Sequence, residues 1–298
     1  MTSIINGLDP NIIVLNETGL KFREKLKIEN YKSFNRNRQD KNMGGVSISV
    51  RDDETKHVVK SSEGKDDDEY LITRHDQFNP AINIITIYGE QESRTNSKEA
   101  EEKWETIVGE LNRIEDRNEF AIIIGDLNKH VGNDHLGVRG GNEKISRGGE
   151  YVRALIESGN YVLVNNSDRC TGGPFTRFDP SCPNNDNNKS TLDLVIVSLS
   201  LSSYIKELNI DSEGLYTPMR VMKTKTVKSD HYPLILTFKG LPIKNSRSRA
   251  KTFSRVVWNT NKPGGWKDYN ELTMNNSIFD EISETEIIDI DKTLAKFN

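Results

Sequence analysis

The stretch FAIIIGDLN at residues 120–128 joins a short apolar run to a polar end. Five apolar residues in succession are typical of a β-strand that is buried on both faces of a sheet. Asp126 and Asn128 follow the run, and two residues apart at a strand end their side chains can face the same way. A carboxylate beside buried aliphatic side chains costs free energy unless it is paired, hydrogen-bonded or bound to a metal ion. The stretch therefore predicts a buried strand that ends in a polar site.

The first 240 residues alternate between strand-like and helix-like patterns. We expect strands at 11–15, 46–50, 82–88, 120–124, 192–197 and 234–238. Apolar residues at helical spacing between 104 and 114 predict a helix with a capped start at Asn96, and a shorter helix is expected at 152–156. The acidic run at 66–69 is expected to be a solvated hairpin tip. This alternation predicts the α/β class.

Composition narrows the classes of function. The chain has 298 residues and a formal net charge of −4, from 41 basic and 45 acidic residues, which argues weakly against simple electrostatic binding of nucleic acid. No apolar run approaches the ~20 residues of a membrane-spanning helix, and the N-terminus lacks the pattern of a secretory signal. Cys170 and Cys182 are too few for a disulfide scaffold or a structural zinc site, so we expect them to be reduced.

The composition changes after Gly240. Residues 241–267 carry seven basic residues and no acidic one, and the chain is acidic from 268 to 291. With few aliphatic residues, this tail is typical of a linker rather than of a second hydrophobic core. We therefore expect one domain at 1–240 and a basic-then-acidic linker at 241–298.

Four carboxylates stand at or near the ends of the expected strands. They are Glu17, Asp126, Asp193 and Asp230, and Asn128 and His231 accompany them. One such carboxylate is most simply a turn or helix cap, but four of them make that explanation unlikely for the whole set. Hard oxygen ligands at strand ends suit Mg²⁺ or Mn²⁺, which also bind phosphate oxygens. The pattern predicts a site for a divalent metal ion.

Together with Tyr88 at the end of its strand, these motifs follow the order typical of the endonuclease/exonuclease/phosphatase superfamily. The chain most resembles the endonuclease domain of non-LTR retrotransposon proteins, which precedes a reverse transcriptase. The resemblance spans residues 1 to about 240. It implies a DNase-like α/β (α+β) fold, a four-layer sandwich of two packed mixed β-sheets flanked by helices.

The resemblance also implies roles in the hydrolysis of a phosphodiester bond. Glu17 would hold Mg²⁺ (or Mn²⁺), with Asp230 near the same site. Asp126 would orient or deprotonate the attacking water, and Asn128 would position that water and the phosphate. These roles match the need for an activated water and for neutralised phosphate oxygens.

The remaining roles concern charge on the phosphate. His231 would bind a phosphate oxygen and would be oriented by Asp193, because a His–Asp pair supplies a charged donor in a defined tautomer. Tyr88 would donate to the phosphate or support the leaving group. In the loop around 175–178, Phe175 and Phe178 near Arg177 could stack on DNA or pack over the sheet edge, and both readings stay open.

The sequence departs from the family's pattern at two places. The family's first strand carries a metal-binding Asn well upstream of the Glu, whereas only sixteen residues precede Glu17 here, so we expect the domain to lack that strand. Tyr88 is followed by Gly89-Glu90-Gln91, where many relatives have a Pro and an Asn.

The resemblance favours a Mg²⁺-dependent endonuclease that cleaves DNA, by nicking a retroelement target or at abasic sites. A phosphatase or phospholipase of the same superfamily is the second hypothesis, and an inactive truncated remnant of a retrotransposon protein is the third. The implied partners are DNA and a downstream reverse transcriptase domain, with no membrane. The implied location is nuclear or cytoplasmic.

Overall fold

The apolar run at 120–124 forms strand β7 (Phe120–Asp126), an interior strand of a six-stranded sheet in the computed structural model. Phe120 and Ile122 lie in one buried cluster, and Ala121 and Ile123 lie in another. Successive side chains of a strand point to opposite faces, so both faces of this strand are buried. Burial on both faces explains why the run has no polar residue.

The structure describes residues 7–38, 44–64, 69–89, 97–141, 143–179, 181, 188–216, 219–222 and 225–244. The chain divides into two compact units, 1–244 and 245–298, and all described residues belong to the first. The expected cap at Asn96, Cys182 and nearly all of the expected linker therefore lie outside the described residues. Within the described part of the chain, no helix combines the length and apolarity needed to cross a membrane.

The large sheet is mixed. Its order is β4 (Val58–Glu63), β5 (Tyr70–His75), β6 (Ile82–Ile87), β7, β12 (Asp193–Ser198) and β8 (Tyr161–Leu163). Strands β6 and β7 run parallel, whereas the other neighbours are antiparallel. A parallel pair needs a crossover connection, and helix α2 (Ser97–Asp116) lies between these two strands in the chain.

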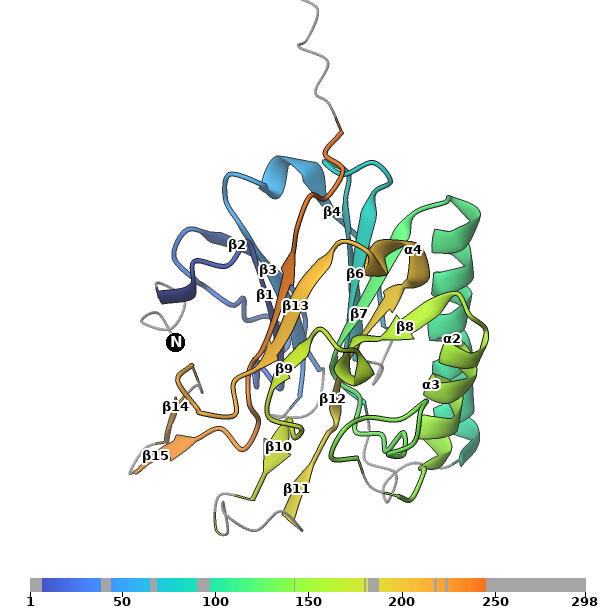
Figure 1. Cartoon of the computed structure of the whole chain (residues 1–298). Coiled ribbons are helices and arrows are strands. Elements are labelled where there is room, and N and C mark those ends of the chain that lie inside the picture. The colour runs from blue at the N-terminus through green and yellow to red at the C-terminus, as the bar shows by residue number, and fades with distance from the viewer. Residues whose placement is uncertain are drawn as a thin grey trace, which may run out of the picture. The chain divides into compact units, whose positions relative to one another are not determined.

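Helices α2 and α3 (Arg147–Glu157) cover one face of this sheet (Figure 1). Ile107, Leu111 and Ile114 of α2 recur at helical spacing and are buried against the sheet, as the periodicity predicts. The α3 helix begins after Ser146, whose side chain accepts a hydrogen bond from the Gly149 amide. Among the described residues there are also three short helices, η1 (Thr55–His57), η3 (Val164–Asn166) and α4 (Leu199–Ser202).

The opposite face of the large sheet packs against two separate three-stranded sheets. One has the order β1 (Ile12–Asn16), β3 (Val46–Arg51), β2 (Tyr31–Arg36), and the other has the order β16 (Leu234–Phe238), β13 (Ile205–Ile210), β9 (Cys170–Gly172). Side chains of both join one core cluster with the large sheet. The predicted α/β fold with mixed sheets is confirmed. Among the described residues β1 pairs only with β3 and β16 only with β13, so the two three-stranded sheets are not joined to each other.

Two short hairpins lie outside these sheets. They are β10 (Arg177–Phe178) with β11 (Lys189–Ser190), and β14 (Met219–Met222) with β15 (Lys225–Lys228). Phe178 is buried and stacks on Tyr232, with 4.7 Å between ring centroids, so this ring packs within the fold. The Phe175 ring lies beneath the Lys189 ammonium at 5.6 Å.

The structure tests the predictions made for two single residues, Cys170 and Glu69. Cys170 is buried and is not in a disulfide. The acidic run at 66–69 was predicted to be solvated, and this is wrong for Glu69, whose side chain is 3% exposed and pairs with Arg38. An arginine partner makes that burial tolerable, and the sequence pattern could not reveal a partner about thirty residues away. Residues 66–68 lie outside the described residues.

A buried carboxylate just before β7, that of Glu119, should make the unfolding free energy depend on pH. Burial opposes the charge of Glu119, but hydrogen bonds from Arg74, Asn83 and Arg117 lower its pKa to about 2. A lowered pKa stabilises the fold above the ordinary value of 4.5, and that contribution is lost as the pH falls through about 2. Between pH 6 and pH 3 we expect the unfolding free energy of Glu119→Gln to fall by roughly 2 kcal/mol less than that of the wild type. Urea unfolding at both pH values checks this, and equal pH dependence in the two proteins would contradict it.

Candidate active site

The register of β7 and β12 brings two of the predicted carboxylates together. Asp126 ends β7, Asp193 begins β12, and the two residues are direct partners across this antiparallel ladder. Directly paired residues project to the same face of a sheet, so the two side chains share one environment. Both side chains are largely buried, with 8% of Asp126 and 14% of Asp193 exposed.

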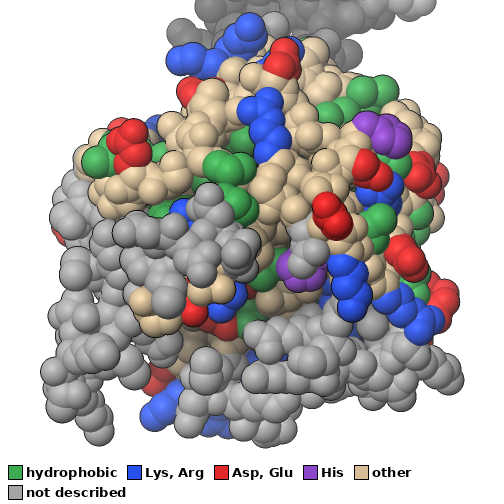
Figure 2. All heavy atoms as spheres, turned by 60° about the horizontal axis from the view of Figure 1, so that its bottom comes forward, with side chains coloured by type: hydrophobic (Ala, Val, Ile, Leu, Met, Phe, Trp, Pro, Cys, Tyr) green, Lys and Arg blue, Asp and Glu red, His purple; other side chains and the backbone are tan. Residues whose placement is uncertain are grey.

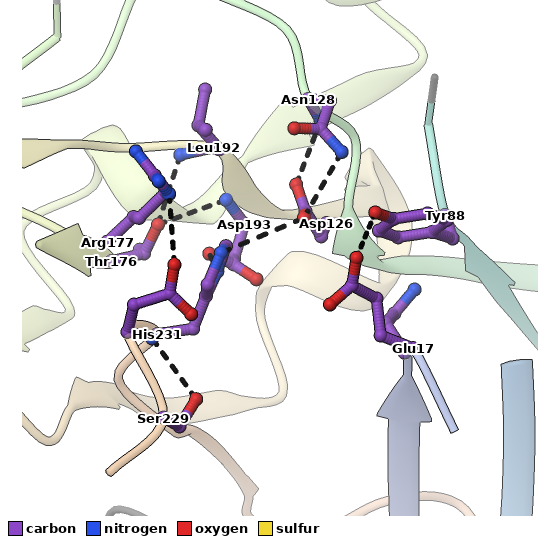
Figure 3. Close-up of polar contacts among 12 residues, drawn as sticks. Glu17, Tyr88, Asp126, Asn128, Thr176, Arg177, Leu192, Asp193, Ser229 and His231 are labelled. Carbon is purple, nitrogen blue, oxygen red and sulfur yellow. Dashed lines mark hydrogen bonds and ion pairs between the residues drawn. The ribbon is translucent and has the colours of Figure 1, made fainter. Parts of the chain in front are cut away.

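His231 lies between these carboxylates. Its Nδ1 atom is 2.8 Å from Asp193 Oδ2, and its Nε2 atom is 3.9 Å from Asp126 Oδ2. The residue belongs to the segment before β16, and its backbone amide donates to the Ser229 hydroxyl at 3.2 Å. Figure 3 shows the imidazole facing both carboxylates from this segment.

These surroundings raise the pKa values of both Asp126 and His231. Burial and the adjacent Asp193 raise the pKa of Asp126. Burial disfavours charge on His231, but the hydrogen bond and charge of Asp193 raise its pKa to about 9. The site therefore holds a carboxylate of increased basicity beside an imidazole that is charged at neutral pH.

Asn128 reaches Asp126 through a turn and not along a shared strand face. Strand β7 ends at Asp126, and Asn128 has a left-handed backbone with φ of 51°. Its backbone amide donates to Asp126 Oδ1 at 2.9 Å, and its side-chain amide lies 3.2 Å from Asp126 Oδ2. The same side-chain nitrogen donates to the Gly89 carbonyl at 2.7 Å. Asn128 is thus held beside Asp126 as predicted, but by a different geometry.

Glu17 and Tyr88 form a second polar pair at the site. Glu17 follows β1, Tyr88 follows β6, and the Tyr88 hydroxyl donates to the Glu17 carboxylate (Figure 3). Burial, together with this hydrogen bond, raises the pKa of Tyr88. The Glu17 charge also contributes to the raised pKa of Asp126, so the two polar pairs are electrostatically connected.

Asp230 lies beside a cation. Arg177 Nε is 3.5 Å from Asp230 Oδ2, and these side chains are 41% and 44% exposed. The two residues predicted to bind metal thus have different neighbours, Tyr88 for Glu17 and Arg177 for Asp230. Their predicted role as metal ligands stays a prediction.

The central cluster has the composition of a metal site. Asp126, Asp193 and His231 each offer one ligand atom, and these atoms lie within 4.8 Å of one another. Two carboxylates placed opposite each other repel, and a divalent cation relieves that repulsion. The residues present therefore fit a divalent metal ion near this cluster, with Glu17 contributing further negative charge.

Thr176, which connects the segments of the site, carries no signal in the sequence pattern. This residue is fully buried, and its hydroxyl accepts hydrogen bonds from the Leu192 and Asp193 amides, each at 3.0 Å. Its carbonyl accepts from the Tyr232 amide at 2.7 Å. Thr176 therefore fixes the start of β12 relative to the segment that carries His231.

Asn165 also supports the start of β12. This buried residue donates to the Asp193 carbonyl at 3.1 Å and accepts from the Val195 amide at 2.7 Å. An isolated Thr or Asn carries no sequence signal for such a contact, because its partners are distant in the chain.

The face that lies at the bottom of Figure 1 is turned forward in Figure 2. Basic and acidic side chains are intermingled over the described part of this face. This distribution accords with the near balance of basic and acidic residues in the whole sequence.

Comparison with known proteins establishes the fold. No protein-family model and no curated protein matches the sequence. The catalytic domain of Xenopus laevis APE2 matches the structure with a TM-score of 0.60 at 15% identity, over 83% of this chain and 88% of that chain. The 3′ phosphatase NExo from Neisseria, solved with a product DNA hairpin, matches with a TM-score of 0.57 at 17% identity, over 80% and 92%.

A third match is the endonuclease domain of TRAS1, a telomere-specific non-LTR retrotransposon, with a TM-score of 0.53 at 14% identity, over 80% of this chain and 89% of that chain. It is one of several equally distant matches. The chain has the fold of the endonuclease/exonuclease/phosphatase superfamily. The prediction is confirmed at this level, whereas the retrotransposon connection stays a prediction.

The pKa of His231 tests the central contact. We expect Asp193→Asn to lower this pKa from about 9 toward the ordinary value of 6.5, because the neutral amide removes the charge that holds the imidazolium. NMR titration of the His231 ring protons measures this. An unchanged pKa would show that Asp193 does not stabilise the charged ring.

The hydroxyl of Thr176 can be tested by an isosteric change. Thr176→Val leaves the buried Leu192 and Asp193 amides without their acceptor, so we expect a loss of about 2 kcal/mol or more in unfolding free energy. Thr176→Ser keeps the hydroxyl and is the matched control. Equal stability of the two variants in urea would contradict this role.

Proposed function

We propose that this protein is a divalent-metal-dependent hydrolase of phosphate esters that cleaves phosphodiester bonds in DNA as an endonuclease. The observation that carries the proposal is the Asp126–His231–Asp193 arrangement. The Asp126 carboxylate, whose pKa is raised, lies 3.9 Å from Nε2 of the His231 imidazole. Asp193 holds Nδ1 of the same ring at 2.8 Å. The similarity of the fold to a 3′ phosphatase solved with a product DNA hairpin and to a retrotransposon endonuclease domain supports this choice of substrate.

The charges at the site suit the proposed roles. Asp126 accepts a proton from the attacking water, since a raised pKa makes it a better base near neutral pH. His231 donates to a phosphate oxygen through Nε2, while Asp193 holds Nδ1 and so fixes the orientation of the ring. Asn128 positions the water and the phosphate beside Asp126. The Tyr88 hydroxyl donates to the phosphate or supports the leaving group, and for this it must exchange its hydrogen bond to Glu17 for one to the substrate.

Mg²⁺ or Mn²⁺ would be held by Glu17 with Asp230 near the same site, beside the Asp126–Asp193–His231 cluster. When bound, the ion supplies charge neutralisation on the phosphate oxygens. For Asp230 to contribute, its contact with the exposed Arg177 side chain at 3.5 Å must open. Such an exposed pair is weak, so the cost of opening it is small.

We further propose that 1–240 is one catalytic domain whose second sheet is interrupted, and that 241–298 is a linker. The two three-stranded sheets would be the halves of the second sheet in a four-layer sandwich. The half-buried apolar residues of the edge strands β1 and β16 support this, because both sets pack on the same core cluster. No described residue pairs with the free edges of these strands.

A phosphatase is the second candidate. The structural match to a 3′ phosphatase from Neisseria favours it, because the same groups can act on a phosphomonoester. The broader second hypothesis includes phospholipases of this superfamily.

An inactive remnant of a retrotransposon protein is the third candidate, and the split of the second sheet favours it. The retroelement reading would also place the protein in the nucleus or cytoplasm, with DNA and a downstream reverse transcriptase domain as partners.

A nicking assay distinguishes these candidates. We expect the protein to nick supercoiled plasmid DNA in Mg²⁺ and to lose activity on addition of EDTA. Asp126→Asn should reduce the rate by at least about 100-fold, because the general base is lost. The control is Asp211→Asn, another buried aspartate, which accepts hydrogen bonds from the Leu215 and Tyr216 amides outside the cluster and should remain active.

Each candidate predicts a different result. Release of phosphate from a 3′-phosphorylated oligonucleotide or from inositol phosphates, without nicking, would favour the phosphatase. A folded protein with no activity on any substrate would contradict the nuclease proposal and favour the remnant. A protein extended upstream, assayed in parallel, tests whether an added strand restores activity.

A further inference from the structure

A buried carboxylate outside the cluster interacts electrostatically with both Glu17 and Tyr88. The Glu69 side chain is 3% exposed, and Glu69 Oε2 is 2.6 Å from Arg38 Nη2. The other oxygen, Oε1, accepts a hydrogen bond from the backbone amide of Gly45. Glu69 thus holds both an arginine and a glycine of the turn that precedes β3.

The same turn holds the segment that follows Glu17. The Thr18 amide donates to the Gly45 carbonyl at 3.2 Å, and the Gly19 amide donates to the Gly44 carbonyl at 2.9 Å. Glu17 itself has a left-handed backbone with φ of 52°. A non-glycine residue keeps that conformation only where neighbouring contacts enforce it. These two hydrogen bonds are such contacts.

The two glycines of the turn leave little room for change. Gly44 and Gly45 have φ values of 95° and 87°, which residues with a Cβ atom rarely adopt. A Cβ at Gly45 would also lie 2.7 Å from Thr18 Oγ1. The turn therefore packs directly against the segment after Glu17, and a displacement of the turn displaces that segment.

Glu69 holds the partner of Glu17 as well. Its backbone carbonyl accepts a hydrogen bond from the Tyr88 amide at 2.9 Å. The side chain of Glu69 thus acts on Glu17 through Gly45, while its backbone acts on Tyr88. Glu69 therefore helps to position both members of the Glu17–Tyr88 hydrogen bond.

We propose that Glu69 is a positioning residue that sets the Glu17 carboxylate in place through the Gly44–Gly45 turn. The proposal rests on the proposed function only in taking Glu17 as a group that binds the metal ion. This positioning role requires a side chain at residue 69 that is long enough to accept the hydrogen bond from the Gly45 amide. A role limited to pairing with Arg38 would require only the negative charge of Glu69.

Two substitutions separate reach from charge. Glu69→Asp keeps the charge but shortens the side chain by one methylene, and Glu69→Gln keeps the length and an acceptor for the Gly45 amide. Glu119→Asp is the matched control, because Glu119 is also buried and paired with arginine but belongs to another part of the fold.

The first measurement is hydrogen exchange of the Thr18 and Gly19 amides by NMR, without metal. We expect Glu69→Asp to speed exchange at both amides by at least about tenfold, and Glu69→Gln to change it by less than about threefold. Glu119→Asp should leave both amides unchanged. Unchanged exchange in Glu69→Asp, or a larger change in Glu69→Gln than in Glu69→Asp, would overturn the proposal.

The second measurement is the affinity for Mn²⁺ alone, by isothermal titration calorimetry. Glu69→Asp should weaken it about tenfold, as expected for residues that orient metal ligands, whereas Glu69→Gln and Glu119→Asp should match the wild type. Faster exchange with unchanged Mn²⁺ affinity would overturn the positioning of Glu17 for metal. If the variants show the expected exchange pattern but the wild-type protein binds no Mn²⁺, the contact network is supported and the proposed function is contradicted instead.

Discussion

The arrangement of the site is governed by two carboxylates that face each other across the β7–β12 ladder and whose repulsion must be offset. Asp126 and Asp193 are direct partners in that register and are largely shielded from water. Such a pair is unfavourable unless a positive charge lies nearby. The His231 imidazole supplies that charge, since its pKa is raised to about 9. The segment before β16 must therefore dock on the large sheet, and Thr176 is the buried residue that connects the two.

A second level of organisation surrounds this cluster. Glu17 stands on a strained backbone at the end of β1, and its conformation is maintained from the turn at Gly44–Gly45. That turn is in turn held by Glu69, whose own burial depends on Arg38. Strands from the large sheet and from the smaller β1–β3–β2 sheet thus meet at one site. The separation of the two three-stranded sheets leaves this contact intact, because the contact involves β1 and β3 and not β16.

Much of the fold could be predicted from local patterns. The wholly apolar run of β7 and the helical spacing of Ile107, Leu111 and Ile114 both reflect burial, which acts on every residue of an element and so leaves a periodic signal. The solvated tip predicted for Glu69 failed because its burial depends on one distant partner, Arg38. Asn128 was placed beside Asp126, but a turn rather than a strand provides the contact.

The class of fold and the residue types at the site can be predicted from local patterns, because strand burial and strand-end carboxylates are local properties of the chain. Which groups act on each other depends on how the strands and segments pack in three dimensions. Asp193 meets Asp126 through strand register, and His231 reaches both from the segment before β16. Asp230 pairs with Arg177. The roles of Thr176, Asn165 and Glu69 likewise appear only in the folded protein. Their contacts join residues far apart in the chain, and the geometry that joins them exists only once the sheets have packed.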